Sequence, residues 1–153
     1  MELTYGSATM KDLPQMVDLL TVLFTDEAEF QPNAEKQRRA LEAILANPTV
    51  GALYVAREGK RVVAMASLLY TISTVEGGRA AWFEDLVVHP DERKRGIGEA
   101  LLKHVVTQAR AAGVTRITLL TDMQNERAQA MYRRAGFVGS PMRPMRLKLK
   151  PGG

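Results

Sequence analysis

Three consecutive cations, at 93–95, run into Gly96 and Gly98 in the stretch ERKRGIGEALL (92–102), where an apolar helical pattern begins. The start of a helix has unpaired N–H groups and the positive end of the helix dipole. Glycines let that backbone approach a phosphate closely, and neighbouring cations add long-range attraction. The stretch therefore predicts an anion site, with a phosphate as the first candidate ligand.

Other glycine motifs fit this stretch less well. The chain has no GxxxxGK sequence followed by Ser or Thr, so a Walker A loop is excluded. A dinucleotide fingerprint needs GxGxxG directly after a strand. Here Leu101 stands at the third glycine position, and seven residues separate the expected strand from Gly96. A basic turn whose glycines serve geometry alone is the structural alternative.

A tyrosine and an asparagine are spaced to share one face of a later helix. Tyr132 follows Asn125 by seven residues, which is two helical turns. A phenol has a pKa of about 10 and a thiol one of about 8.5. Tyr132 is therefore protonated at neutral pH and can donate a proton to a leaving group of lower pKa, such as a thiolate. The alternative is a structural tyrosine in an amphipathic stripe that includes Met131.

Two adjacent carboxylates, Glu84 and Asp85, lie on an expected strand just before the glycine loop. An alkyl-ammonium group has a pKa of about 10.4, so an amine that attacks an acyl group needs a proton acceptor. Strand alternation points the two side chains to opposite faces, and we expect only one to reach the amine. Glu84 and Asp85 are both candidate bases at this point, and a chain of waters is the alternative to either. A carboxylate that is only solvated, or only pairs with an arginine, is the structural reading.

Two segments of the chain resemble the signatures of the GNAT superfamily of N-acetyltransferases. The first is EDLVVHPDERKRGIGEALL, an expected strand and loop followed by a helix. At the start of that helix it matches the pattern (R/Q)-x-x-G-x-(G/A). The second is the strand RITLLT followed by N-x-x-A-x-x-x-Y-x-x-x-G-F. The matching residues are Arg93, Gly96 and Gly98, and then Asn125, Ala128, Tyr132, Gly136 and Phe137. The resemblance covers roughly the whole chain and is specific over about 80–137.

The resemblance implies acetyl-CoA as co-substrate and assigns residues to it. Tyr132 would be the general acid and Glu84 the base, and Asn125 would bind the coenzyme near the start of its helix. The pantetheine arm would pair like an extra strand with the backbone of Leu86, Val87 and Val88. The diphosphate would lie on the backbone N–H groups of Arg95, Gly96, Ile97 and Gly98, with Arg93 and Lys94 nearby.

The implied reaction moves an acetyl group from acetyl-CoA to a primary amine of a small molecule or peptide, by direct attack in a ternary complex. A thiol acyl-enzyme is excluded because the chain has no cysteine. A polyamine, a protein N-terminus, a lysine, an amino acid and an aminoglycoside all fit as acceptors. The acidic residues Asp26, Glu27 and Glu29 would favour a cationic one, and an exposed acidic turn explains them equally well. The alternative function is a non-catalytic acyl-CoA-binding or sensor module, which needs neither Tyr132 nor Glu84.

The elements that must position these residues follow from apolar periodicity and turn signals. Strands are expected at 3–7, 50–58, 61–73, 80–88, 116–121 and 137–138 and in the tail, and helices at 11–24, 34–46, 97–112 and 126–135. Trp82 is expected in the core, or else in the wall of the acceptor pocket. This order predicts one α/β (α+β) domain over 1–153, with about four helices around a mixed, mostly antiparallel sheet. By resemblance, the sheet splays between 80–88 and 116–121, and the coenzyme lies in the gap.

The net charge of +4 belongs to the tail. From position 141 onward the chain holds four cations and no acid, which leaves 17 basic against 17 acidic residues before it. A nucleic-acid partner is therefore not expected. The tail, in which cations alternate with apolar residues, is interpreted as a strand with one solvent-exposed face.

The rest of the composition excludes several other classes of protein. No run approaches the roughly 18 apolar residues of a membrane span, and the N-terminus lacks the pattern of a secretory signal. With no cysteine and two histidines, no metal site is expected. We therefore expect a cytoplasmic protein that contacts neither membrane nor metal. Because dimers are common among the proteins that it resembles, a homodimer is compatible with the resemblance.

Overall fold

The computed structural model describes residues 2–27 and 30–150, in which five strands form one sheet in the order β1-β2-β3-β4-β5. The strands are β1 Leu3–Ser7, β2 Gly51–Glu58, β3 Arg61–Ser73, β4 Gly78–Val88 and β5 Ile117–Leu119. The α-helices are α1 Leu13–Asp26, α2 Ala34–Ala46, α3 Ile97–Ala111 and α4 Glu126–Arg134. Two short 3-10 turns, Met10–Asp12 and Pro90–Glu92, precede α1 and the glycine loop.

The sheet is mixed, as expected. Each of β1, β2 and β3 pairs antiparallel with the next strand, whereas β4 and β5 run parallel. The parallel ladder has only three pairs and ends where Phe83 faces Leu119. From there to Val88, β4 is paired with β3 alone among the described residues. The expected splay between these two strands therefore begins after Phe83.

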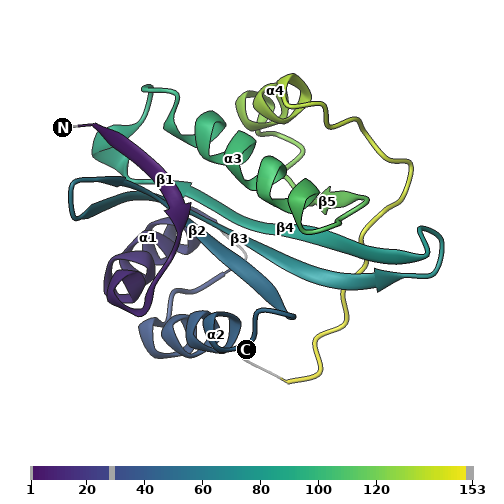
Figure 1. Cartoon of the computed structure of the whole chain (residues 1–153), viewed down its shortest axis with the longest axis horizontal. Helices are drawn as coiled ribbons and strands as arrows, with labels where there is room; N and C mark the ends of the chain where they lie inside the picture. Colours follow the sequence, from purple (N-terminus) through teal and green to yellow (C-terminus); the bar gives the residue numbers. More distant parts are fainter. Residues whose placement is uncertain (1, 28–29, 151–153) are drawn as a thin grey trace.

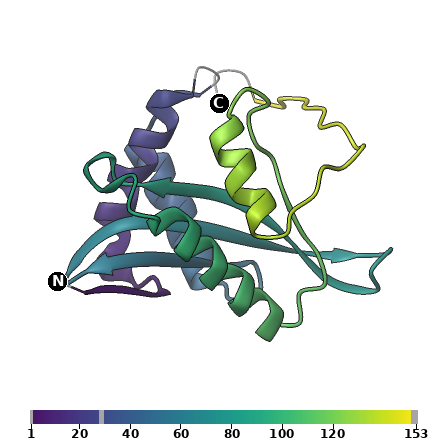
Figure 2. The ribbon, with the colours of Figure 1, turned by 90° about the horizontal axis from the view of Figure 1, so that it is seen from above.

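Helices cover both faces of the sheet (Figures 1 and 2). One buried cluster joins α3 to the sheet, and side chains of α4 such as Tyr132 pack against it. A second cluster joins α1 and α2 to the opposite face. The two clusters fit the apolar stripes in the sequence, because helical residues three and four apart share a face. The glycine loop and α4 thus lie on the α3 side, and the acidic end of α1 lies on the other.

Local capping sets several helix ends. The side chain of Asn33 accepts a hydrogen bond from the backbone N–H of Lys36 at 3.1 Å, which starts α2 as expected. The first helix differs from the prediction. Thr9 and Asp12 form a capping box, with the Thr9 N–H donating to the Asp12 carboxylate at 2.7 Å, but a 3-10 turn follows and α1 begins only at Leu13.

The expected strands at 137–138 and in the tail are absent from the described residues, and β5 is shorter than predicted. Figure 1 shows the tail leaving α4 and running past the sheet toward the side of α2. There the guanidinium of Arg146 lies 5.8 Å from the centre of the Phe30 ring. Pro141 and Pro144 carry no N–H for a ladder. Alternating side chains are therefore insufficient to form a strand, since a ladder also needs a matching edge.

No helix within residues 2–27 and 30–150 combines the length and the apolar character that crossing a membrane requires.

Candidate active site

The N-terminus of α3 is open to a ligand. Gly96 caps it in the left-handed conformation, with φ +74°, and no side chain accepts from its first N–H groups. By contrast, asparagine side chains cap both α2 and α4. A Cβ on Gly98 would lie 3.3 Å from Cγ2 of Val88, so glycine lets the start of α3 pack closely on the end of β4. The backbone of 95–98 thus forms an amide cradle of the kind that binds anions.

The three cations before this cradle have different surroundings. The guanidinium of Arg95 pairs with Glu58, at 3.1 Å, and with Glu92. Arg93 lies 3.9 Å from the carboxylate of Asp26, and its Nε donates to the backbone carbonyl of Val88 at 3.4 Å. Lys94 has no ion pair within the described chain. Two of the three cations therefore keep charge that an incoming anion can use.

The free edge of β4 leads from the end of the β4–β5 ladder toward this cradle. Leu86 pairs with Ala66 of β3, and Val88 pairs with Ala64. On their other side, β5 pairs with nothing beyond Phe83 in the part of the chain that the structure describes. Such an edge can hydrogen-bond an extended ligand as if it were an added strand.

One of the two candidate bases, Glu84, lies in a β-bulge directly before the other, Asp85. Ser67 pairs with Asp85 and Leu68 with Phe83, so Glu84 is the extra residue. The bulge shifts the alternation of β4. Phe83 and Val87 would share a face in a regular strand, but Phe83 packs in the α3 cluster and Val87 in the α1 cluster on the opposite face. The prediction that simple strand alternation sets the directions of Glu84 and Asp85 is therefore wrong at this point. A bulge is defined by the pairing with the neighbouring strand, so the sequence of β4 alone does not reveal it.

The two carboxylates have different environments. Glu84 is exposed. The Ser67 hydroxyl donates to the Asp85 carboxylate at 2.8 Å, and the Asp85 N–H donates to the same hydroxyl oxygen at 3.1 Å. Burial raises the pKa of Asp85 to about 6, against the effect of the Ser67 hydrogen bond, and the charges of Glu84 and Glu27 add to the rise.

Further acidic groups gather near these carboxylates. Burial raises the pKa of Glu27, at the end of α1, and the negative charge of Asp122, which follows β5, adds to the rise. Glu29, which we also expected to favour a cationic acceptor, lies outside the described residues. Glu27 thus interacts electrostatically with both Asp85 and Asp122, although the three carboxylates come from separate segments. The field near the ladder end is therefore negative.

Tyr132 lies at the point where β4 and β5 part. Its ring meets Phe83 and Phe137 edge to face, with centroids 6.4 and 5.9 Å apart. Burial raises the pKa of Tyr132, with no hydrogen bond contributing within the described residues. The phenol is therefore protonated at neutral pH, and no group among the described residues competes for its hydroxyl.

Two other expected residues have roles that the sequence did not fully predict. The Asn125 side chain accepts from the Ala128 N–H at 3.0 Å, so its carbonyl oxygen caps α4 and only its amide NH₂ stays available to a ligand. Trp82 is 38% exposed, which contradicts a core position. Ser67 and Glu92, which contact Asp85 and Arg95, were missed. Ser67 lies 18 residues from Asp85 in the sequence, and Glu92 lies near Arg95 but is also bound by Arg61, which is 31 residues away.

No group of three or more His, Asp or Glu side chains within residues 2–27 and 30–150 is arranged to hold a metal ion.

Known proteins share this fold. An integron cassette protein from the mobile metagenome of Cole Harbour Salt Marsh matches with a TM-score of 0.84 and 27% identity, over 96% of this chain and 91% of that one. A predicted acetyltransferase from Clostridium acetobutylicum, whose crystal structure contains acetyl-CoA, matches with a TM-score of 0.78 and 22% identity, over 97% of each chain.

Sequence relatives agree with the fold. The aminoalkylphosphonate N-acetyltransferase of Salmonella typhimurium is 29% identical over 89% of this chain and 85% of its own length. The amino-acid acetyltransferase of Ralstonia nicotianae is 32% identical over 86% of this chain, which spans only 25% of that protein. This chain spans less than two-fifths of the length of several other curated relatives that it matches. The model of the acetyltransferase (GNAT) family matches residues 13–137, and the chain therefore belongs to this family.

Proposed function

We propose that this protein transfers an acetyl group from acetyl-CoA to a primary amine by direct attack in a ternary complex. The observation that carries the proposal is the free edge of β4, which leads from the ladder end at Phe83 to the amide cradle at 95–98. An extended molecule with a diphosphate at one end and a thioester at the other fits such a track. Tyr132 lies where the thioester would stop.

The residues that would hold the coenzyme follow that track. The amides of Arg95, Gly96, Ile97 and Gly98 would receive the diphosphate, with Arg93 and Lys94 adding charge. The backbone of Leu86, Val87 and Val88 would pair with the pantetheine arm. The Asn125 amide NH₂ would bind the coenzyme from the start of α4.

Tyr132 is the proposed general acid. As the C–N bond to the amine forms and the C–S bond breaks, the phenol would give its proton to the departing thiolate. Its packing against Phe83 and Phe137 supports the role, since a fixed ring keeps the hydroxyl at one place. Its raised pKa keeps the proton on the oxygen until the thiolate forms.

Glu84 is the proposed proton acceptor for the amine. The bulge leaves this side chain exposed beside the ladder end, where solvent and an acceptor can reach it. Asp85 is the alternative, because a carboxyl with a pKa of about 6 is better matched to neutral pH than an ordinary one. The hydrogen bond from Ser67 occupies part of that carboxylate and favours Glu84.

The acceptor is proposed to carry positive charge besides the reacting amine. The carboxylates of Glu27, Asp85 and Asp122 support this, since their negative field attracts cations. Both relatives named above act on amino compounds by their printed names, an amino acid and an aminoalkylphosphonate. A polyamine or a lysine-containing peptide fits the negative field better than either of these.

Release of free thiol from acetyl-CoA tests the function. The chain has no cysteine, so a thiol reagent reports coenzyme A alone. Purified protein should release thiol only when acetyl-CoA and an amine are both present, in a panel of polyamines, amino acids, peptides and aminoglycosides. Coenzyme binding without turnover across that panel would instead favour an acyl-CoA-binding module. Absence of coenzyme binding would refute both functions.

A further inference from the structure

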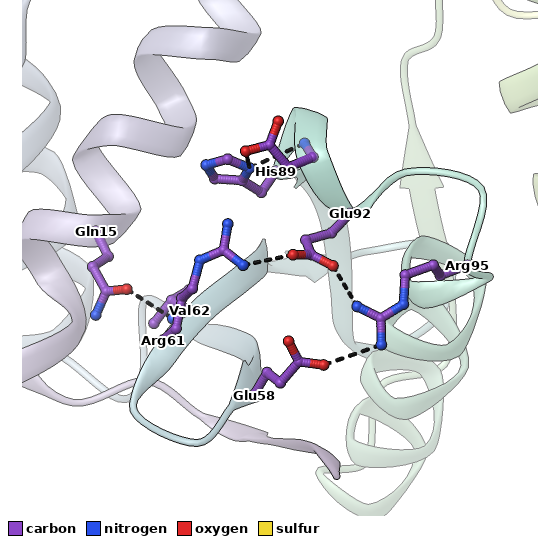
Figure 3. A network of polar contacts seen from close by, with 8 residues as sticks. Gln15, Glu58, Arg61, Val62, His89, Glu92 and Arg95 are labelled. Carbon is purple, nitrogen blue, oxygen red and sulfur yellow. Dashed lines mark hydrogen bonds and ion pairs between the residues drawn. The ribbon is translucent and has the colours of Figure 1, made fainter. Parts of the chain in front are cut away.

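Four side chains form an alternating ionic chain beside the cradle (Figure 3). Glu92 lies between two arginines: Arg61 donates to its Oε1 at 2.5 Å, and Arg95 donates to its Oε2. Arg95 also donates to Glu58 at 3.1 Å. The side chain of Glu92 is only 12% exposed. Two positive and two negative charges thus neutralise one another between the loop and the β2–β3 hairpin.

The hairpin end of this chain is anchored. Glu58 and Arg61 are a cross-strand pair at the hairpin turn. The Gln15 side chain of α1 accepts from the Val62 N–H at 2.8 Å (Figure 3). It also donates to the Lys60 carbonyl at 3.3 Å. Hydrogen bonds therefore connect α1 to the hairpin, and the ionic chain connects the hairpin to the loop.

The loop end carries unfavourable backbone conformations. Lys94, at φ +68°, is the one non-glycine residue with positive φ among the described residues, and Gly96 is also left-handed. A left-handed residue with a Cβ is unfavourable and persists where surrounding contacts enforce it. Glu92 and Arg95 flank this turn directly, on its two sides. Their shared ion pair therefore spans the strained residue and holds it in place.

We propose that Glu92 is a positioning residue for the coenzyme site. It ties the loop at 90–96 to the β2–β3 hairpin and so keeps the amide cradle at 95–98 formed before the diphosphate arrives. Arg95 acts in this arrangement as a structural link, and Arg93 and Lys94 supply the charge for the phosphates. The inference rests on the proposed function, because it assigns the cradle to coenzyme A.

The sign of the effect of Glu92→Gln separates positioning from simple electrostatics. The substitution removes a negative charge beside a site for a polyanion, so Coulomb's law alone predicts tighter coenzyme binding. Positioning predicts weaker binding, because only the fraction of molecules with a formed cradle can bind. If that fraction falls to about a tenth, the apparent Kd for coenzyme A rises about tenfold. Glu58→Gln should act in the same direction through Arg95, and the double variant should change the Kd by less than the product of the single effects.

Calorimetric titration with coenzyme A measures these constants, and Glu42→Gln is the matched control. Glu42 pairs with Arg38 on α2, so the control removes the same charge and an ion pair away from the loop and should leave the Kd unchanged. In turnover, Glu92→Gln should raise the KM for acetyl-CoA and leave the KM for the amine unchanged. A merely structural role would lower the melting temperature and the active fraction without this split.

The measured affinities distinguish failure of the proposed function from failure of the positioning role of Glu92. Wild-type protein that does not bind coenzyme A overturns the proposed function together with this inference. Wild-type binding combined with equal or tighter binding by Glu92→Gln overturns the inference alone. Should Glu92→Gln fail to fold, Glu58→Gln decides, and unchanged or tighter binding by that variant counts against positioning in the same way.

Discussion

The rings of Phe83 and Tyr132 meet edge to face, with their centroids 6.4 Å apart. Phe83 is the last residue of β4 that pairs with β5. One contact thus joins Tyr132, in the second segment that resembles a coenzyme site, to the residue directly before the first such segment. Phe83 ends the parallel ladder, and Tyr132 projects from α4 toward the same point. The position of the phenol is therefore set by the place where the sheet opens.

Replacing Tyr132 with Phe should remove the proton donor and keep the ring packing. We expect kcat to fall about ten- to a thousand-fold, as for loss of a general acid. The Kd for coenzyme A and the melting temperature should change little, because both ring contacts persist. Steady-state kinetics with calorimetry checks this prediction, and wild-type turnover in the variant would remove Tyr132 from the mechanism.

Replacing Asp85 with Asn should stabilise the protein above pH 6. The native pKa of Asp85, about 6, is above its ordinary value of 3.8, so between these values the native state binds more protons than the unfolded state. The free energy of unfolding of the wild type therefore falls as pH rises through this window, and stays lower above it. The variant should gain on the order of 2 kcal/mol at pH 7–8 and little at pH 4. Urea unfolding at several pH values measures the gain, and a uniform gain at all pH values would contradict the explanation.

Replacing Glu84 with Gln should separate the two candidate bases. If Glu84 takes the amine proton, kcat/KM should fall about a hundredfold or more while Asp85→Asn retains most activity. If Asp85 is the base, the roles reverse, and wild-type activity should decline as pH falls below about 6, because the carboxylate becomes protonated. The pH profile of kcat/KM in both variants distinguishes the cases. Full activity in both variants would exclude both carboxylates as the base and assign the proton of the amine to water.

Replacing Gly96 with Ala should weaken coenzyme binding, and Gly113 provides the control. Both glycines are left-handed, with φ +74° and +79°, so alanine at either costs about 1 kcal/mol of stability. Gly113 follows the other end of α3, away from the cradle. Only Gly96→Ala should raise the Kd for coenzyme A. Equal affinities in the two variants would show that the cradle does not bind the coenzyme.

Replacing Glu27 with Gln should affect the acceptor rather than the coenzyme. Loss of this charge weakens the negative field near Asp85 and Asp122, so the KM for a polyamine should rise a few-fold. The KM for a singly charged amine of similar size should change less, and the KM for acetyl-CoA not at all. Equal changes for both amines would indicate that acceptor charge is not recognised here.

The sequence by itself determined most of the elements and the glycine positions of the cradle. The bounds of α2, β2, β3 and α3 agree with the predictions to within one residue, because apolar periodicity, Asn33 and Gly96 act on neighbouring residues. The two motifs also indicated the family before any contact was known. These signals are local, since a cap or a helical stripe needs no partner elsewhere in the chain.

Tertiary structure alone decided how the site is assembled. The bulge at Glu84 exists only relative to β3, and the raised pKa of Asp85 depends on burial beside Ser67. The hydrogen bond from Arg61 to Glu92 joins residues 31 apart in the sequence. The tail shows the converse, because its alternating pattern has no edge to pair with in the described residues. Register, burial and long-range ion pairs depend on which segments meet, and no local pattern of side chains contains that information.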